Sequence, residues 1–470
     1  MMTYQDFLKV ADDDKDRMDF VRMVISQHQE SDLYKNAIDA ENYFNVQNTT
    51  INEYVKTLTT ATGRIVEDEW SPNHQVASGF FKRFAIQQNQ FLLGNGITWG
   101  NEATEKRLGK RFDNRLQEMG ENSIVDAVSF GFWNKDHLEV FRVKEFAPLY
   151  DEENGTLRMG VRFWQIDPSK PLRATLYEED GCTEYIWNTR DGKESGEILK
   201  PKRAFVKVRT VTQAEGELAD GDRNYEGFPI IPLWANRQHT TELLAIKDGI
   251  DAYDLIKNGF ENELDTAQLY WIVKGAGGMD NQDLVQFLDR LLKNRIASID
   301  GDQDISAQEI SVPYAAREAL LDRIEADLYR DYMALNTDDI KSGSVVNAQI
   351  KAAYEGMNAK ADKFEYQIHD FLDNLLAIVG IDDEATFTRS MLVNGAEMIS
   401  MLIQAGEYLS KDYITEKILT ILGDADKVQE VLKQMDEEDM DRLPEAPTEP
   451  EETEESDEPE EVAEDEESMA

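Results

Sequence analysis

Three consecutive stretches decide the fold: PYAAREALLDRIEADLYRDYMAL (residues 313–335), NTDDIKSGSVVN (336–347) and AQIKAAYEGMNAKADKFEYQIHDFLDNLLAIV (348–379). In the first and third, apolar residues recur every three or four positions, which places them on one face of a helix. The middle stretch is polar and interrupts that period. Pro313 suits a first helical turn, and Gly380 is a typical residue just past a helix end. The sequence therefore predicts a helix, a polar connection and a second helix of about 50 Å, because each helical residue adds about 1.5 Å.

The region before Pro313 predicts a small α/β insert held between two long helices. The first of these helices spans about 241–268 and has one apolar face. Glycines at 275–278 and alternating apolar residues then divide the insert into short elements. We expect strands at 269–274, 295–300 and 309–312 and a helix at 280–294.

The N-terminal part predicts helices up to about residue 120 and antiparallel strands from about 132 to 212. Asn-Gly and Asp-Gly pairs, typical of hairpin turns, separate the strands. Three shorter helices are expected after Gly380. The helical stripes are Leu33/Ala37/Ala40/Phe44, Val76/Phe80/Phe84/Phe91 with Asn73 as N-cap, and Leu108/Phe112/Leu116/Met119 ended by Gly120; the alternating strands are Leu157/Met159/Val161/Phe163 and Ala204/Val206/Val208; the turns are Asn154-Gly155, Asp180-Gly181 and Asp191-Gly192; the late helices span 388–405, 413–422 and 426–435.

The chain is strongly acidic. Its 470 residues carry a formal net charge of -45. Nineteen acidic residues and one basic residue, Arg442, follow Met435, so the last residues cannot bury enough apolar surface to fold. The acidic excess argues against tight, non-specific binding of nucleic acid, which needs Lys and Arg to neutralise phosphates. It remains compatible with a surface past which DNA slides without sticking.

Cys182 is the single cysteine, so neither an intrachain disulfide nor a cysteine zinc site is expected. This usage fits a reducing cytoplasm. The first residues contain no apolar segment typical of a signal peptide. No run approaches the roughly 18 apolar residues of a membrane span, so we expect no membrane association.

Several stretches, taken in order, resemble the portal proteins of tailed double-stranded-DNA bacteriophages, in the branch typified by long-tailed phages. The clearest is PIIPLWANRQHTTELLAIKDGIDAYDLIKNGFENELD, residues 229–265. No single motif is diagnostic, but the ordered set is specific, and it covers roughly residues 30–390. The supporting stretches are residues 80–99, 146–166, 313–335 and 346–381.

The resemblance implies a mostly helical α+β portal fold that assembles into a ring, usually of twelve subunits. Such a subunit has a wing, a stem of two helices, a small α/β clip, a helical crown, and a loop that points into the tunnel. Carried onto this chain, the wing is 1–236, the first stem helix 237–268, the clip 269–312, the second stem helix 313–335, the tunnel loop 336–347, the long wing helix 348–380 and the crown 381–442, followed by a disordered acidic tail at 443–470.

The resemblance also implies a function and partners. The ring would sit at one capsid vertex, as a channel through which double-stranded DNA is packaged and ejected without sequence preference. A terminase packaging motor, a head-completion or adaptor protein, and the scaffold and major capsid proteins would dock to it. The expected location is the virion, and the host cytoplasm during assembly.

The polar connection is the strongest candidate for contact with DNA. Its one lysine lies among small residues, and weak, replaceable contacts to phosphates suit a moving polymer. A solvated connector without a ligand is the alternative reading. Two lysines of the first long helix could face the channel, although solvated or interface positions are the more usual role. The candidate residues are Lys341, Ser342, Gly343 and Ser344 in the loop, and Lys247 and Lys257 on the helix.

Metal and catalytic sites are not expected, and no cofactor is implied. Two aspartate runs begin like calcium loops, but Ile305 and Tyr225 stand where each loop needs glycine. Nucleotide-binding, zinc-protease and hydrolase motifs are missing from the sequence. The aspartate runs are Asp300/Asp302/Asp304 and Asp220/Asp222/Asn224.

Two other function classes stay open at this point. A metal-dependent nuclease would need a convergent set of carboxylates held by rigid elements. A non-enzymatic scaffold or adaptor of virion assembly would give small oligomers or filaments without a central hole.

Overall fold

The computed structural model describes residues 2–10, 13–59, 63–69, 71–190, 193–211, 218–266, 270–274, 304–308, 314–337, 347–391, 395–424 and 427–441. The chain divides into two compact units, Met1–Leu392 and Val393–Ala470. Each unit is described by itself below. None of the helices in the described ranges combines the length and the apolar character needed to cross a membrane.

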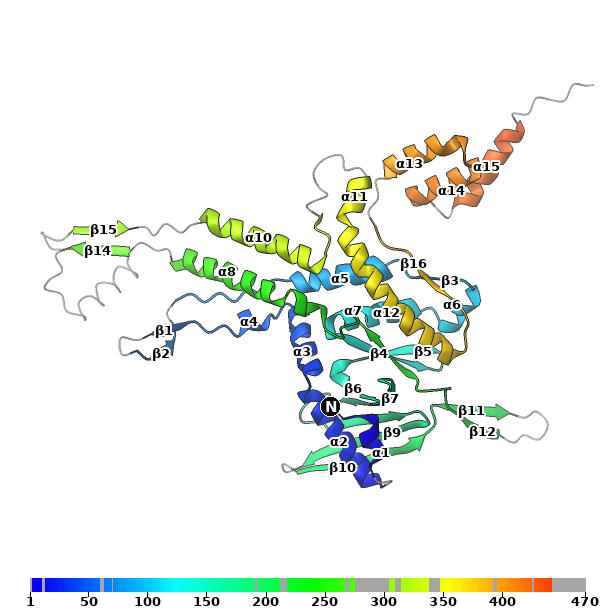
Figure 1. Ribbon diagram of the computed structural model, residues 1–470, viewed down its shortest axis with the longest axis horizontal. Helices are drawn as coiled ribbons and strands as arrows, with labels where there is room; N and C mark the ends of the chain where they lie inside the picture. The colour runs from blue at the N-terminus through cyan, green and yellow to red at the C-terminus, as the bar shows by residue number, and fades with distance from the viewer. Residues whose placement is uncertain are drawn as a thin grey trace, which may run out of the picture. The chain divides into compact units, whose positions relative to one another are not determined.

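The larger unit combines helices with several small antiparallel sheets, which confirms the α+β class (Figure 1). Its helices bury apolar faces against the sheets and against one another. The helices are α1 Tyr4–Leu8, α2 Asp14–Glu30, α3 Asp32–Phe44, α4 Thr49–Asn52, α5 Phe80–Leu93, α6 Glu102–Leu108, α7 Phe112–Asp126, α8 Lys247–Thr266, α10 Tyr314–Tyr332, α11 Asn347–Ala353 and α12 Glu355–Val379, with 3-10 turns η1 Val143–Glu145 and η2 Glu242–Ala245.

Every strand pairing among the described residues is antiparallel. The largest sheet has the order β10-β9-β8-β7-β6, a meander of consecutive hairpins, and a second has the order β13-β4-β5. The remaining pairs are β1-β2, β11-β12, β14-β15 and β16-β3. The strands are β1 Thr57–Thr59, β2 Ile65–Glu67, β3 Ile97–Trp99, β4 Val128–Asn134, β5 His137–Arg142, β6 Phe146–Tyr150, β7 Leu157–Trp164, β8 Leu172–Glu178, β9 Gly181–Arg190, β10 Lys193–Arg203, β11 Val206–Val211, β12 Leu218–Arg223, β13 Ile230–Trp234, β14 Tyr270–Lys274, β15 Asp304–Gln308 and β16 Ala385–Phe387.

Helix α12 organises the main core. Its apolar face packs with α5, α7 and the sheet of β13, β4 and β5. Gly131 of β4 lets the Phe371 ring approach so closely that an added Cβ would lie 2.8 Å from it. The buried α12 side chains in this cluster are Phe364, Ile368, Phe371, Leu372, Leu375, Leu376 and Val379.

The helices around the polar connection are largely as predicted. Helix α10 lies within the predicted 313–335, and Gly380 ends α12 in the left-handed region with φ 71°. The predicted 348–379 helix is interrupted at Tyr354, whose ring stacks on Phe91 at 5.5 Å.

Two N-terminal helix predictions are wrong. Residues 72–79 are extended rather than helical, and α5 begins only at Phe80, because polar side chains of α8 bind this backbone, as described below. Gly120 does not end the predicted stripe that starts at Leu108, because α7 continues to Asp126. The stripe is instead divided at Gly109, whose φ of 88° ends α6. Such a φ is favourable only for glycine.

The insert is described only in part. Strand β14 confirms the strand predicted at 269–274. Strand β15 occupies 304–308, where no strand was predicted, and it pairs with β14. The helix predicted at 280–294, the strands predicted at 295–300 and 309–312, and the Asp191-Gly192 turn lie outside the described residues.

The smaller unit is described as a helical group. The predicted start at residue 388 is too early, because residues 388–391 are not helical and the described helix begins at Gly395. Residues 443–470, the predicted acidic tail, lie outside the described part. The helices are α13 Gly395–Gln404, α14 Lys411–Leu422 and α15 Val428–Asp441.

Candidate functional site

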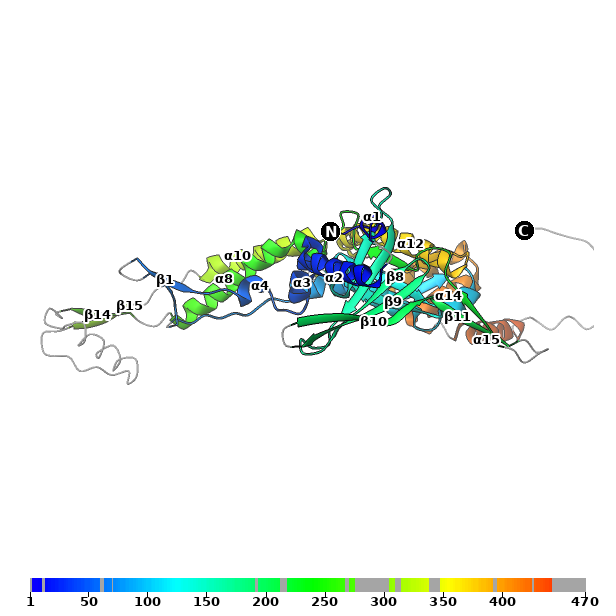
Figure 2. The same ribbon diagram turned by 90° about the horizontal axis from the view of Figure 1, so that it is seen from below.

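The site is built on the antiparallel pair of α8 and α10, which lie side by side in Figures 1 and 2. At one end Gly249 of α8 faces Leu328 of α10, with so little space that an added Cβ would lie 2.8 Å from the leucine. At the other end Phe260 meets Tyr314 edge to face at 5.6 Å. The pair ends where the polar connection begins.

Helix α10 has an acidic exposed face. Its sequence holds five acidic and three basic residues, and each of its three arginines has a carboxylate partner. Glu318 and Asp322 are exposed, and neither carboxylate has an ion-pair partner among the described residues.

Lys247 faces the body of its own unit. Its ammonium lies 3.5 Å from Asp39 and 3.5 Å from Asp251, and 5.1 Å from the centre of the Tyr43 ring. Burial opposes its charge, but these neighbours outweigh burial and raise the pKa of Lys247. Lys257 is half-buried, and the described residues give it no ion pair. The channel-lining role of both lysines stays a prediction, and the geometry gives Lys247 an intrachain role as well.

The candidate loop residues Lys341, Ser342, Gly343 and Ser344 lie outside the described residues. The start of their connection is described, and it is held tightly. The side-chain amide of Gln87 accepts a hydrogen bond from the Leu335 N–H at 3.0 Å and donates one to the Leu335 carbonyl at 3.1 Å. These two bonds fix the backbone at Leu335, the last residue before the polar connection.

A buried lysine joins three elements close to the two Gln87–Leu335 hydrogen bonds. The Lys360 ammonium of α12 lies 2.8 Å from Glu242, donates to the Tyr332 carbonyl at 3.1 Å and sits 3.2 Å from the centre of the Tyr332 ring. The Tyr332 hydroxyl donates to Gln88 at 2.7 Å. Burial lowers the pKa of Lys360, while Glu242 acts against this shift. Lys360 thus ties the last turn of α10 to α12 and to the start of the α8 segment.

Sequence reasoning missed Lys360, Glu242 and Gln87. A signal was present, because Lys360 lies three residues after Met357 on the apolar face of α12. A charged residue at a core-facing position is rarely buried unless it is paired. Its partner could not be read from the sequence, since Glu242 is more than a hundred positions away.

A polar ladder holds an extended segment along α8. Asp254, Asn258 and Asn262 follow one another at every fourth position, and all three are buried. Their side-chain oxygens accept the backbone N–H groups of Ser78 at 3.0 Å, Val76 at 2.7 Å and His74 at 2.7 Å, respectively. Asn258 also donates to the Val76 carbonyl at 3.0 Å.

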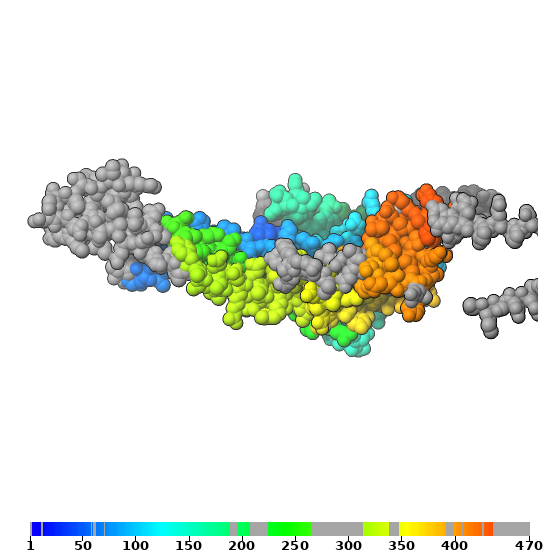
Figure 3. Space-filling view, turned by 90° about the horizontal axis from the view of Figure 1, so that it is seen from above, coloured from blue at the N-terminus to red at the C-terminus, as the bar shows by residue number. Residues whose placement is uncertain are grey.

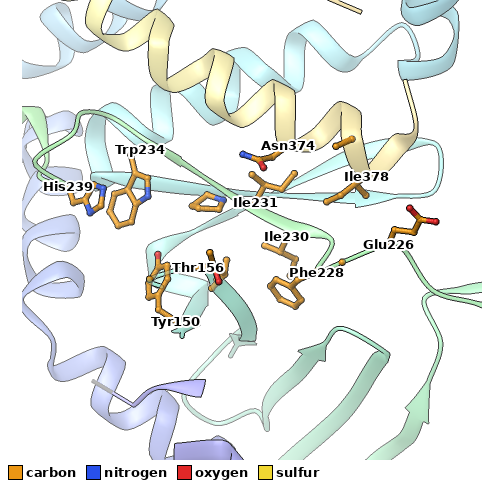
Figure 4. Close-up of a pocket in the computed structure, with 15 residues that line it drawn as sticks. Tyr150, Thr156, Glu226, Phe228, Ile230, Ile231, Trp234, His239, Asn374 and Ile378 are labelled. Carbon is orange, nitrogen blue, oxygen red and sulfur yellow. The ribbon is translucent and has the colours of Figure 1, made fainter. Parts of the chain in front are cut away.

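A separate cavity of about 710 Å³ lies between α12 and the segments around β13 (Figure 4). Its walls are mostly apolar. His239 stacks on Trp234 with ring centres 3.7 Å apart, and burial lowers the His239 pKa. Figure 4 places Glu226 at the opposite end from His239, so these two groups do not form an acid–base pair.

The described residues contain no cluster of three or more His, Cys, Asp or Glu side chains suited to a metal ion. Cys182 is buried. Asp220 and Asp222 lie in strand β12 and Asp304 in strand β15, rather than in loops.

The sequence profile of the family "Phage portal protein, SPP1 Gp6-like" matches residues 25–444. The chain belongs to the phage portal protein family. It is 22% identical over 432 residues to the portal protein of Bacillus phage SPP1, covering 83% of this chain and 81% of that protein. It is 24% identical over 184 residues to the portal protein of Clostridium phage phiCD119, covering 37% of this chain and 41% of that protein.

Solved structures of gene transfer agent particles also align with this portal protein. The neck of an empty particle gives a TM-score of 0.41 at 11% identity, over 73% of this chain and 90% of that chain. A native virion gives 0.40 at 11% identity, over 72% and 87%. The family assignment itself rests on the sequence match. Portal proteins are ring-forming channel components of the phage virion, and the family is generally structural rather than enzymatic.

Proposed function

We propose that twelve copies of this chain form a closed ring at one capsid vertex, through which double-stranded DNA is packaged and later ejected. The family match over residues 25–444 carries this proposal. Imaging of the purified protein, with its mass measured in parallel, tests it. Rings with a central hole and a mass near twelve copies are expected. A protein that stays monomeric at high concentration would contradict the ring.

Within this ring, α8 and α10 act as the stem and the exposed acidic face of α10 lines the channel. Support comes from the unpaired carboxylates of Glu318 and Asp322 and from the pairing of every α10 arginine. A wall with more carboxylates than cations offers DNA few phosphate contacts, so DNA keeps its mobility. Replacing Glu318 and Asp322 with lysine should slow packaging while rings still form. Packaging at the wild-type rate would remove α10 from the channel wall.

The tunnel loop at 336–347 supplies the moving contact with DNA, with Lys341 touching phosphates and Ser342, Gly343 and Ser344 allowing close approach. Its anchorage at Leu335 and beside Lys360 supports a loop that works from a fixed base. Lys341→Glu should reduce the amount of DNA packaged, whereas Lys106→Glu, at an 80% exposed lysine elsewhere, should not. Equal packaging by both variants would contradict the contact.

The remaining assignments follow the same layout. The clip at 269–312 would receive the terminase motor during packaging and the adaptor afterwards, because β14 and β15 form the far end of the helix pair. The crown would be 381–442, and the acidic tail at 443–470 would attract basic segments of scaffold or capsid proteins. Assembly would occur in the host cytoplasm. Binding of purified terminase to rings lacking 275–303 tests the clip, and unchanged binding would contradict it.

A further inference from the structure

An arm with several exposed apolar residues runs beside α8, and no described residue covers these side chains. The arm comprises the described residues of 53–78: an outgoing leg, the β1-β2 hairpin and a return leg. Figures 1 and 2 show the hairpin standing clear of α8, and Figure 3 shows it protruding beside the helix. A two-stranded ribbon with three residues in each strand is marginal in water unless something packs on it.

The arm is held in place although it is exposed. The return leg is fixed to α8 by the ladder of Asp254, Asn258 and Asn262. The two legs are tied together, because Gln75 donates to the Tyr54 carbonyl at 2.8 Å and the Asp68 N–H donates to the Lys56 carbonyl at 2.8 Å. These bonds fix the backbone and leave side chains free. A surface ordered in advance loses little entropy when it binds.

Several exposed side chains on this surface are large and apolar, beside exposed charged residues such as Glu67 and Glu69. Ile65 of β2 is 69% exposed. Scattered apolar residues are normal on a surface, but a contiguous apolar patch marks an interaction site. The others on the arm and the adjoining face of α8 are Tyr54, Val55, Val66, Val76, Leu255 and Leu264.

A cavity of about 340 Å³ lies in the seam between the arm and α8. Tyr54 and Leu255 give it apolar walls, and an added Cβ at Gly259 would meet no atom within 4 Å. Lys56 also lines it, and its hydrogen bond goes to the Pro72 carbonyl at 3.4 Å rather than to a carboxylate. Glu263 also lines the cavity, but its carboxylate is paired with Arg317 at 2.7 Å, so Lys56 can still accept an acidic side chain beside an apolar one.

We propose that this seam is the receptor for a second copy of the chain, so that each arm–α8 surface packs on a different surface of the neighbouring subunit. The proposal rests on the ring, since closure requires one surface of a subunit to meet another surface of the next. Charge favours the same partner: the chain has a net charge of -45, so a second copy offers mainly carboxylates to this seam. Such carboxylates complement Lys56.

Crosslinking in the full-length ring tests the contact. A photoreactive benzoylphenylalanine replaces Ile65, or for comparison Ile166, which is 87% exposed in the β7–β8 connection. On illumination, the residue at position 65 should crosslink one subunit to its neighbour. Mass spectrometry of the crosslinked product should identify an attachment point on the neighbour that lies outside its arm. Crosslinks from position 65 that stay within one chain, or that reach only another virion protein, would overturn the proposal.

Assembly of substituted chains gives an independent readout. Ile65→Asp should raise the protein concentration needed for half-assembly about tenfold or more, because each interface then loses the favourable free energy of burying an isoleucine side chain. Ile166→Asp should leave that concentration within about twofold. Asn258→Ala should weaken assembly in the same direction as Ile65→Asp, because it frees the return leg. Equal effects of the two aspartate variants, or none from either arm variant, would refute the arm contact.

The outcome separates two failures. If the unmodified chain forms no rings, the proposed function fails before the arm is tested. If it forms rings of normal mass and the Ile65 variants behave like the Ile166 variants, the ring stands and the arm proposal alone is wrong.

Discussion

Replacing Lys360 with methionine should destabilise the larger unit by about 3–4 kcal/mol. The Lys360 side chain is 12% exposed and that of its partner Glu242 is 14% exposed, so both charges are largely removed from water. Removing one partner of a buried ion pair leaves an uncompensated charge, which costs roughly 3–5 kcal/mol. The better packing of a methionine side chain offsets part of this cost. Among the described residues, Glu242 then keeps the amide of Asn236, at 2.9 Å, as its one side-chain hydrogen-bond donor.

A double variant separates the contribution of the ion pair from that of the Lys360 hydrogen bond to the Tyr332 carbonyl at the end of α10. Lys360→Met with Glu242→Gln removes both charges, and we expect it to lose only about 1–2 kcal/mol, mainly the hydrogen bond to the Tyr332 carbonyl. The coupling between the two substitutions should therefore be at least about 2 kcal/mol. Lys106→Met is a suitable control, because its pair with Glu102 is almost fully exposed and worth less than about 1 kcal/mol.

Urea unfolding followed by tryptophan fluorescence measures these differences, at a protein concentration below that of assembly and with the denaturant slope compared between variants. The reasoning is refuted if the single Lys360 variant lies within about 1 kcal/mol of the parent protein. It is also refuted if the double variant is no more stable than the single one, since the cost would then not come from an unpaired charge.

Three further changes test other parts of the fold. Burial outweighs the bond to the Val143 carbonyl and lowers the pKa of His28, so His28 stays neutral in the folded protein while the unfolded chain takes up a proton near pH 6.5. The free energy of unfolding should therefore fall as the pH drops through this range, by at most about 1.4 kcal/mol per pH unit. His28→Gln should reduce this pH dependence when denaturation is compared at pH 7.5 and pH 5. Val46 has φ 60°, which a β-branched residue adopts only under strain, so Val46→Gly should raise the unfolding free energy by about 1 kcal/mol, and a loss in calorimetry would contradict this. An added Cβ at Gly160 would lie 2.1 Å from the Phe146 ring, so Gly160→Ala should cost roughly 3 kcal/mol or more, and a thermal midpoint equal to that of the parent protein would show that the ring can move aside.

The sequence predicted correctly those helices and strands that are determined by residues close to them in the chain. Helix α10, the end of α12 at Gly380 and strand β7 follow from periodicity and turn residues close in sequence. The extended segment before Phe80 was missed because Asp254, Asn258 and Asn262 determine it from almost two hundred positions away. Apolar spacing alone could not distinguish it from a helix.

The site divides in the same way. The sequence predicted a helix pair and a polar connection, and the described part of α8 and α10 has that form. It did not predict that Lys247 binds Asp39 and Asp251, or that Lys360 secures the base of the connection, since these partners meet only in the fold. Lys341 lies outside the described residues, so its contact with DNA stays a prediction.

The ladder on α8 also sets a limit on its own length. Four residues of helix advance about 6.0 Å, whereas two residues of extended chain advance about 6.6 Å. Each added rung therefore brings a mismatch of about 0.6 Å, and a few rungs bring the two spacings out of step. The next rung would need an N–H at Pro72, which has none. Adding one residue between His74 and Ser78 would therefore move the N–H groups on one side of the insertion out of register with their partners on α8, and there it would turn the opposite face of the return leg toward the helix.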